Sequence, residues 1–156
     1  MTTGIFKSEE LMQQQIDCAL IEFDLKVARK IGEIAVAIAS DKSLPISISI
    51  RSGDWEVFKA ALPGAKPEQD SWIERKYRVV QLKGNSTMYE RVKAEEAGID
   101  WHQENGVTDA THAIHGGGFP LKTKDGTLQG ALLISGLPQV EDHLLAVEIL
   151  KKYLSN

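Results

Sequence analysis

The sequence predicts a single α+β domain covering 1–156, in which two hairpins form an antiparallel sheet flanked by helices. The first observation is the alternation of isoleucine with polar residues over 46–51, followed by a turn and a second strand-like run over 55–62. The second is the pair Asp125-Gly126 between two further strand-like runs. The third is helical periodicity around the hairpins, which gives the order α, α, β, β, α, α, loop, β, β, α.

Two helices precede the first hairpin. Ser8 opens the first helix, which is expected to end before Phe23. Asp24 caps a longer helix that runs to about Ser40 and has its apolar residues on one face. Gly32 lies inside this helix, where glycine costs about 1 kcal/mol relative to alanine. Its presence there indicates close packing against the sheet.

Two more helices follow the first hairpin. The residues at 68–70 open a helix that ends at Gly84, because glycine readily takes the left-handed conformation of a helix end. Ser86, or Asn85 beside it, caps the next helix, which runs to about Ala97.

The stretch 99–114 has no clear periodicity and is predicted to be a loop with a short turn of helix. A fifth strand could lie within 107–115, which would give a sheet of about five strands.

The second hairpin has arms at 119–124 and 127–135. The Asp125-Gly126 pair between them predicts a type I′ turn, which needs positive φ at both central residues. Both faces of the second arm are largely apolar, so this arm is expected to be a central strand covered on both sides. Gly130 within it indicates that a neighbouring element comes close.

The last helix starts after Gly136 and Pro138, and its acidic first turn and basic last turn suit the helix dipole. One apolar stripe is predicted along it. Its members are Val140, Leu144, Val147, Leu150 and Leu154.

Composition excludes several classes of protein. A net charge of −4 gives no electrostatic footprint for nucleic acid or an anionic membrane. No run reaches the roughly 18 apolar residues of a membrane helix, and the first residues lack the layout of a signal peptide. The single cysteine, Cys18, excludes an internal disulfide. A cytoplasmic protein is therefore expected.

The pair His112 and His115 has the spacing H-x-x-H, which on a helix places both imidazoles on one face and suits a metal ion. The alternative is that these histidines hold loop backbone or an interface. A third metal ligand would have to come from His102, Asp109, Asp142 or His143.

The run Gly116-Gly117-Gly118 could present backbone N–H groups to an anion, or could form a tight strand entry that needs positive φ. The second reading is preferred, because the run matches no phosphate-binding motif. Arg75 and Lys76 could receive a carboxylate, a propionate or a phosphate, or could belong to a solvated basic patch.

Ser135-Gly136 and the helix start that follows, with Asp142 and His143, could line a pocket. No nucleophile elbow surrounds Ser135, so a catalytic serine is disfavoured.

Several of these motifs together resemble the haem-degrading domain family, which includes glycolate-operon-type proteins and haem-binding sensors. They are HGGGFPL at 115–121, DG at 125–126, SGLPQVEDH at 135–143 and WIERKYRVV at 72–80. The resemblance is to a cytoplasmic branch of the family and covers 23–154.

The resemblance implies a profilin-like fold with about five antiparallel strands flanked by helices, and a homo-oligomer. It also raises haem or another tetrapyrrole as a candidate ligand. The pocket-side positions that it implies are Lys76, Gly116, Gly117, Gly118, Ser135, Gly136 and Asp142, and its motif in this branch adds His115 and His143.

Three functions follow as hypotheses. The first is an oligomeric binding domain for a small anionic ligand, either a tetrapyrrole or an organic acid, held by Arg75 and Lys76, with the glycine run closing over it and His115 or His143 orienting it. The second is an assembly or protein-interaction module without catalysis. The third is a metal-dependent enzyme that uses His112, His115 and His143.

Overall fold

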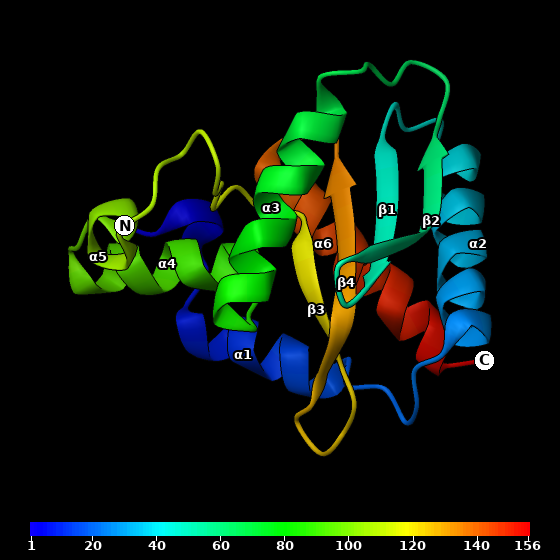
Figure 1. Cartoon of the computed structure of the whole chain (residues 1–156), viewed down its shortest axis with the longest axis horizontal. Helices are drawn as coiled ribbons and strands as arrows, with labels where there is room; N and C mark the ends of the chain where they lie inside the picture. Colours follow the sequence, from blue (N-terminus) through cyan, green and yellow to red (C-terminus); the bar gives the residue numbers. More distant parts are fainter.

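The computed structural model describes all residues from 1 to 156 and shows an α+β fold (Figure 1). The strands are β1 (Ser47–Ser52), β2 (Trp55–Ala61), β3 (Gly118–Lys122) and β4 (Leu128–Ser135). The helices are α1 (Ser8–Asp17), α2 (Leu25–Asp41), α3 (Gln69–Lys83), α4 (Thr87–Ala97), α5 (Trp101–Asn105) and α6 (Gln139–Leu154), with a short 3-10 turn, η1, at Thr3–Ile5.

The sheet has four antiparallel strands in the order β2-β1-β4-β3, so the two predicted hairpins lie side by side and pair through β1 and β4. The expectation of about five strands is wrong, because 107–115 forms no strand. Instead, the backbone of this segment forms hydrogen bonds with two helices. The N–H of Ala113 donates to the carbonyl of Arg75 in α3, and Arg91 in α4 donates to the carbonyl of Ile114.

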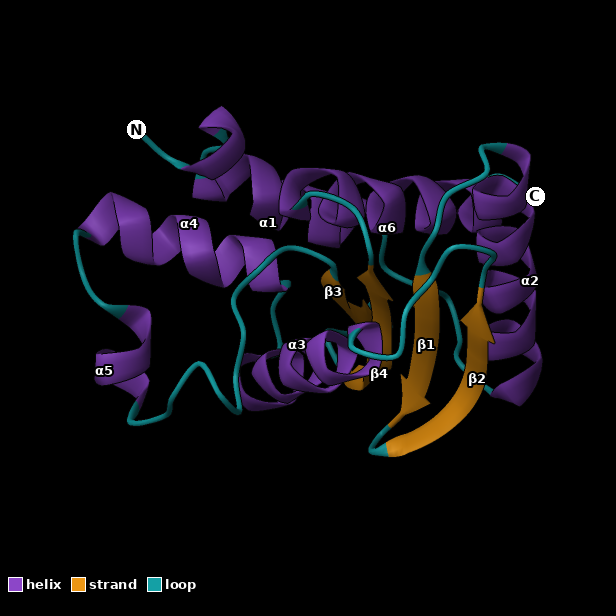
Figure 2. Ribbon diagram, turned by 90° about the horizontal axis from the view of Figure 1, so that it is seen from above, coloured by secondary structure: helices purple, strands orange, loops and turns teal.

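Helices cover both faces of the sheet. α2 and α6 lie on one face and α3 on the other (Figure 2). β4 is buried from both sides: Leu132 and Ile134 belong to the main core beside α2 and α6, while Ala131 and Leu133 pack under α3. The prediction of a central strand covered on both sides is confirmed.

The two glycines expected at close approaches are both confirmed. A Cβ at Gly32 would lie 2.5 Å from the ring of Phe58 in β2. A Cβ at Gly130 would overlap the carbonyl oxygen of Arg51 in the neighbouring strand β1. At each position the absence of a side chain lets two backbones or layers meet.

The predicted helix caps are largely confirmed. The Asp24 carboxylate accepts from the N–H of Val27, and the Ser86 hydroxyl accepts from the N–H of Tyr89. Gly84 ends α3 in the left-handed conformation. Ser8 is the first residue of α1 and not its cap, because its hydroxyl donates to Glu96 and is not used by the helix.

The stripe predicted for α6 is wrong at Leu144, whose side chain is exposed. The buried residues of this helix instead include the neighbours Asp142 and His143. The reason is that α6 is covered on two sides: the sheet lies on one, and the ring of Phe6 from the N-terminal segment meets His143 on the other.

The turn of the second hairpin is not type I′, because only Gly126 has a positive φ, of 89°. Asp125 keeps a negative φ since its carboxylate accepts from the Thr123 hydroxyl and the Thr127 N–H. The hairpin lies where it was predicted, with a different turn.

None of the helices in this fold has both the length and the apolar character needed to cross a bilayer.

Candidate functional site

A polar cavity of about 300 Å³ opens at the end of the sheet where β4 stops and α6 begins. Gly136 turns the chain sharply there with a φ of 140°, which brings the first turn of α6 toward α3. We name it the Lys76 cavity. Its lining residues are Glu68, Gln69, Trp72, Lys76, His115, Ser135, Gly136, Leu137, Gln139 and Asp142.

A buried ion pair forms one wall of this cavity. The ammonium group of Lys76 lies 3.3 Å from a carboxylate oxygen of Asp142 and donates to the carbonyl of Ile134 at 2.8 Å. The other oxygen of Asp142 accepts from the N–H of Leu137 at 3.1 Å. Both charged side chains are 3% exposed. Together they join α3, β4 and α6 at one point.

Burial favours the neutral form of both members of the pair. It lowers the pKa of Lys76 and raises the pKa of Asp142 to about 6. The attraction between the two charges works against burial in each case, and the Leu137 N–H also favours the carboxylate. The pair is therefore more readily neutralised by proton transfer than an exposed pair would be.

The three glycines pass directly behind this pair. A Cβ at Gly117 would overlap the carbonyl oxygen of Ile134 and lie 2.8 Å from the Lys76 nitrogen, and the φ of Gly117 is 127°. The N–H groups of Gly116 and Gly118 already donate to the side chains of Gln139 and Thr87. The geometry thus favours a tight strand entry over an anion-binding loop.

His115 brings an imidazole to the cavity from the loop before β3. Its ring meets Trp72 edge-on at 4.6 Å, and its buried Nδ1 atom has no hydrogen-bond partner. Burial and the nearby charges of Arg91 and Lys76 lower its pKa, so the ring is neutral at neutral pH. His115 therefore brings a neutral imidazole to the cavity wall, while its Nδ1 atom is itself buried.

Five predicted ligand-binding residues do not line the cavity: the three glycines at 116–118, Arg75 and His143. Arg75 points away from Lys76, because its guanidinium binds the Asp109 carboxylate at 2.7 Å and stacks on Trp72 at 4.2 Å. His143 is fully buried on the far side of α6, where its Nε2–H donates to the side-chain carbonyl of Gln14.

The predicted histidine cluster does not assemble. The His112 ring lies within hydrogen-bond distance of the Thr111 hydroxyl, and the backbone carbonyl of His112 accepts a hydrogen bond from the His102 ring. His115 faces the cavity instead, and His143 faces α1. No three histidine, cysteine, aspartate or glutamate side chains of the chain lie close enough together to hold a metal ion.

Five cavity residues were not predicted, namely Glu68, Gln69, Trp72, Leu137 and Gln139. Helical spacing could have found two of them, because Gln69 and Trp72 precede Lys76 by seven and four residues and share its face of α3. Gln69 fixes this end of α3 by accepting from Ser47 and donating to the carbonyl of Pro45.

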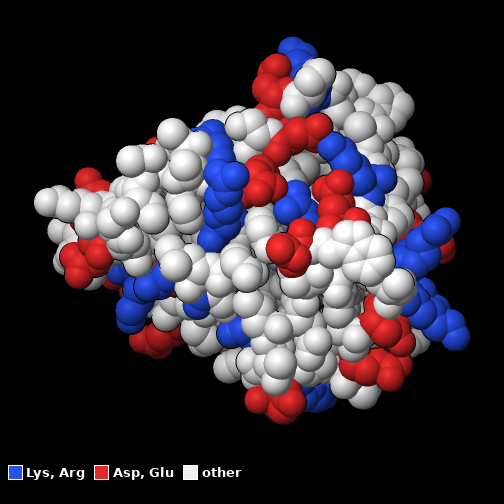
Figure 3. Space-filling view, in the orientation of Figure 1, with Lys and Arg blue, Asp and Glu red and all other residues white.

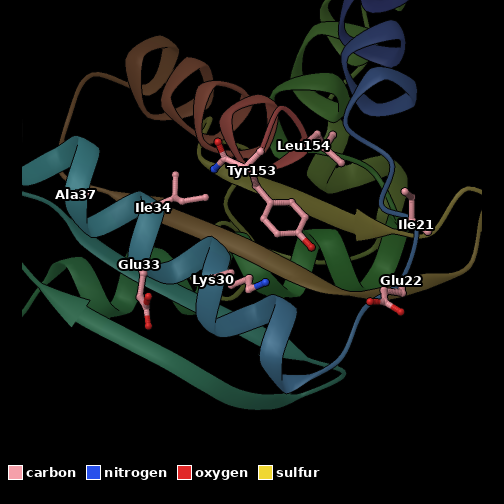
Figure 4. A pocket seen from close by; sticks show the side chains of 9 residues that line it. Ile21, Glu22, Lys30, Glu33, Ile34, Ala37, Tyr153 and Leu154 are labelled. Carbon is pink, nitrogen blue, oxygen red and sulfur yellow. The ribbon is translucent and has the colours of Figure 1, made fainter.

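A second hollow, of about 620 Å³, lies between α2 and the end of α6. Tyr153 projects from α6 toward α2 across it (Figure 4). It is lined by Ile21, Glu22, Lys30, Glu33, Ile34, Ala37, Tyr153, Leu154 and Asn156, none of which was predicted to bind a ligand.

The face of the molecule that carries α3 mixes acidic and basic side chains (Figure 3). Several of them pair, including Arg51 with Glu74 at 3.0 Å and Lys59 with Asp70 at 2.6 Å. This mixture gives no field of a single sign on this face.

The burial of His143 predicts that the protein loses stability in mild acid. Burial lowers the pKa of this ring from 6.5 to about 4, and its Nδ1 has no partner. Between these values the unfolded chain binds a proton that the folded chain does not, so the free energy of unfolding falls as the pH is lowered through that window. The loss should reach about 3 kcal/mol.

Urea unfolding at pH 7 and pH 4 measures this loss, because at pH 5 the window is crossed only in part. His143→Gln should lose less stability than the parent protein over the same interval, because glutamine does not titrate. Asp142 titrates in the opposite sense, since its raised pKa favours proton uptake by the folded state, and the comparison of the two proteins cancels it. Equal losses in both would show that His143 is not the cause.

Comparison with known proteins agrees with the resemblance seen in the motifs. The profile of the HbpS-like haem-degrading proteins matches residues 23–151. A UPF0303 protein of Streptomyces avermitilis is 35% identical over 146 residues, which are 94% of this chain and 90% of the relative. A UPF0303 protein of Rhizobium johnstonii is 37% identical over 133 residues, which are 85% and 82% of the two chains.

Solved structures show the same fold. The Ybr137w protein superimposes with a TM-score of 0.89 at 25% identity, over 97% of this chain and 90% of its own. The complex of PduOC with haem gives a TM-score of 0.70 at 20% identity, over 84% and 94% of the two chains. HbpS gives 0.67 at 16% identity, over 100% and 99%. By its sequence and its profilin-like α+β fold, this chain belongs to the HbpS-like family of haem-degrading proteins.

Proposed function

We propose that the protein binds a small organic acid in the Lys76 cavity. The observation that carries this proposal is a buried ammonium group, Lys76, in the wall of a small and mostly polar cavity. A volume of about 300 Å³ stands at the lower end of the roughly 300–1,000 Å³ range of ligand pockets, which suits a ligand of few atoms.

Donors for a carboxylate converge on this space. The Lys76 ammonium has three N–H bonds, and Ile134 and Asp142 take two of them, so one remains for a ligand. The Ser135 hydroxyl also lines the cavity. Gln139 accepts from Gly116 through its carbonyl oxygen, which leaves its N–H₂ group for the ligand.

Haem is the second candidate, favoured by the family description and by the haem complex of the structural neighbour PduOC. The cavity of one chain does not fit a haem. Trp72 and Leu137 are its only hydrophobic lining residues, whereas a tetrapyrrole ring needs two broad apolar walls. The imidazole of His115 in the cavity wall is the one feature that suits the iron.

Calorimetric titration with pyruvate, lactate and succinate tests the proposal, with a spectroscopic haem titration beside it. We expect saturable binding of at least one acid, weakened about tenfold in His115→Ala through loss of roughly 1.4 kcal/mol of hydrogen bonding. His112→Ala is the matched control, because that histidine lies three residues away and outside the cavity, and its affinity should be unchanged.

A saturable Soret shift without binding of any acid would select haem in place of an acid. Binding of neither would overturn the proposal and favour the assembly module. The metal-dependent enzyme has no support from the placement of His112, His115 and His143.

The proposal includes a cytoplasmic homo-oligomer, which the family resemblance implies. Several large apolar side chains lie exposed on one chain and could be covered by a second copy. They include Ile5, Ile16, Ile21, Leu25 and Trp55. Light scattering coupled to size-exclusion chromatography measures the number of subunits.

A further inference from the structure

From an amine in the cavity wall that lies 3.3 Å from a buried carboxyl group, we infer that Lys76 reversibly forms an imine with the carbonyl carbon of a bound 2-oxo acid. This inference rests on the proposed function and deepens it, because it names the class of acid and gives Lys76 and Asp142 separate chemical roles.

The position of Lys76 suits a nucleophile. Its side chain is held along α3 with its nitrogen fixed by the carbonyl of Ile134 at 2.8 Å, and the missing side chain of Gly117 leaves room beside it. Only the neutral amine attacks a carbonyl group, and burial lowers the pKa of Lys76 toward that form. Exposed lysines of the chain have no such environment.

Asp142 is placed to carry the protons. Burial raises its pKa to about 6, so its carboxyl group can both donate and accept a proton near neutral pH. It lies 3.3 Å from the Lys76 nitrogen, close enough to exchange protons with the groups that react there. Separating the environments of an acid and a base in this way is how one site performs both steps.

The step balances without any other reactant. The Lys76 ammonium first gives a proton to the Asp142 carboxylate, and the neutral nitrogen attacks the carbonyl carbon. A C–N bond forms while the π pair moves to oxygen, which takes the proton from Asp142. The nitrogen then returns a proton to Asp142, which passes it to the hydroxyl group. Water leaves as the nitrogen lone pair forms the C=N bond, so the ammonium and the ketone become an iminium ion and water.

Other residues of the cavity favour a ligand that carries a carboxylate next to its carbonyl group. Ser135 and Gln139 offer hydrogen-bond donors within the same small space as the Lys76 nitrogen. The imidazole of His115 in the cavity wall gives the ligand one further polar partner. A simple aldehyde would leave these groups without a partner and should react more weakly.

Reduction of the imine tests the inference. The protein is incubated with pyruvate and sodium cyanoborohydride, which delivers hydride to the C=N carbon and makes the bond permanent. We expect one adduct per chain, with the added mass of the acid less one oxygen atom, and peptide mapping should locate it on Lys76. Excess lactate, which has the carboxylate but no carbonyl group, should protect Lys76.

Variants distinguish reaction of Lys76 in the cavity from reaction of lysines on the surface. Lys124→Met removes an exposed lysine at the opposite end of the β3–β4 hairpin and should leave the adduct unchanged. The double variant Lys76→Met/Asp142→Leu removes the amine without leaving a buried charge, and it should give no adduct. Asp142→Asn should slow trapping about a hundredfold, as expected for loss of a general acid, while lactate affinity changes much less.

Peptide mapping keeps the test decisive even if a variant fails to fold. Adducts spread over several lysines and unaffected by lactate, or no adduct at all, would overturn the inference. If calorimetry shows that pyruvate binds but Lys76 is not trapped, the inference fails and the proposed function stands. If none of pyruvate, lactate and succinate binds, the proposed function itself fails.

Discussion

Replacing Lys76 with methionine is expected to lower the free energy of unfolding by about 3–5 kcal/mol. The substitution leaves the carboxylate of Asp142 buried without its partner, and Asp142 is only 2% exposed. The Leu137 N–H donates to one carboxylate oxygen. The other oxygen accepts from the Lys76 ammonium in the parent and would lose that donor in the variant. Urea unfolding at pH 7 measures the loss.

The loss should depend on pH in a definite direction. Burial raises the pKa of Asp142, so the folded state takes up a proton more readily than the unfolded state. The variant lacks the Lys76 charge that lowers this pKa in the parent, so its Asp142 takes up the proton more readily than that of the parent. Lowering the pH from 7 to 5 should therefore narrow the deficit of the variant relative to the parent. A deficit that widens toward pH 5 would contradict the pairing of Asp142 with Lys76.

The double variant Lys76→Met/Asp142→Leu is the control for this cycle. Removing both charges exchanges a costly buried ion pair for apolar contact, which is often neutral or stabilising. It should therefore recover most of the stability that Lys76→Met loses. If the double variant is as unstable as the single one, the loss comes from packing around Lys76 and not from an unpaired charge.

Replacing Gly117 with alanine is expected to cost at least about 4 kcal/mol or to prevent folding, which is exceptional for the addition of one methyl group. The new Cβ would overlap the carbonyl of Ile134 and lie 2.8 Å from the Lys76 nitrogen. It would also require an L-residue at a φ of 127°. To relieve these overlaps, β3 would have to move away from β4, or the hydrogen bond from Lys76 to the carbonyl of Ile134 would have to break.

Gly126→Ala separates backbone strain from overlap. Gly126 also has a positive φ, of 89°, but a Cβ there would meet no atom within 4 Å. Its replacement should cost only about 1–2 kcal/mol from the left-handed backbone. Thermal unfolding of both variants provides the comparison. Similar losses in the two would show that the space behind the cavity is not tight.

The sequence alone determined the local elements and the family. Caps such as Asp24, Ser86 and Gly84 use a residue's own backbone and its near neighbours, so their signal survives without knowledge of the fold. The two hairpins followed from alternation at 46–51 and from the Asp125-Gly126 pair, and the doubly covered β4 followed from the apolar residues on both of its faces. Of the positions named from the motifs, the structure places five in the wall of the Lys76 cavity, namely Lys76, His115, Ser135, Gly136 and Asp142.

Only the tertiary structure decided which side chains meet. Adjacent helical residues point about 100° apart, so Lys76 enters the cavity while Arg75 turns outward to Asp109, and Asp142 enters while His143 packs against the N-terminal segment. The H-x-x-H spacing suggested one metal site, but its segment is a loop bonded to α3 and α4, which sends His112 and His115 to different surroundings. These outcomes depend on contacts between segments far apart in the chain, and local spacing carries no information about how distant layers pack.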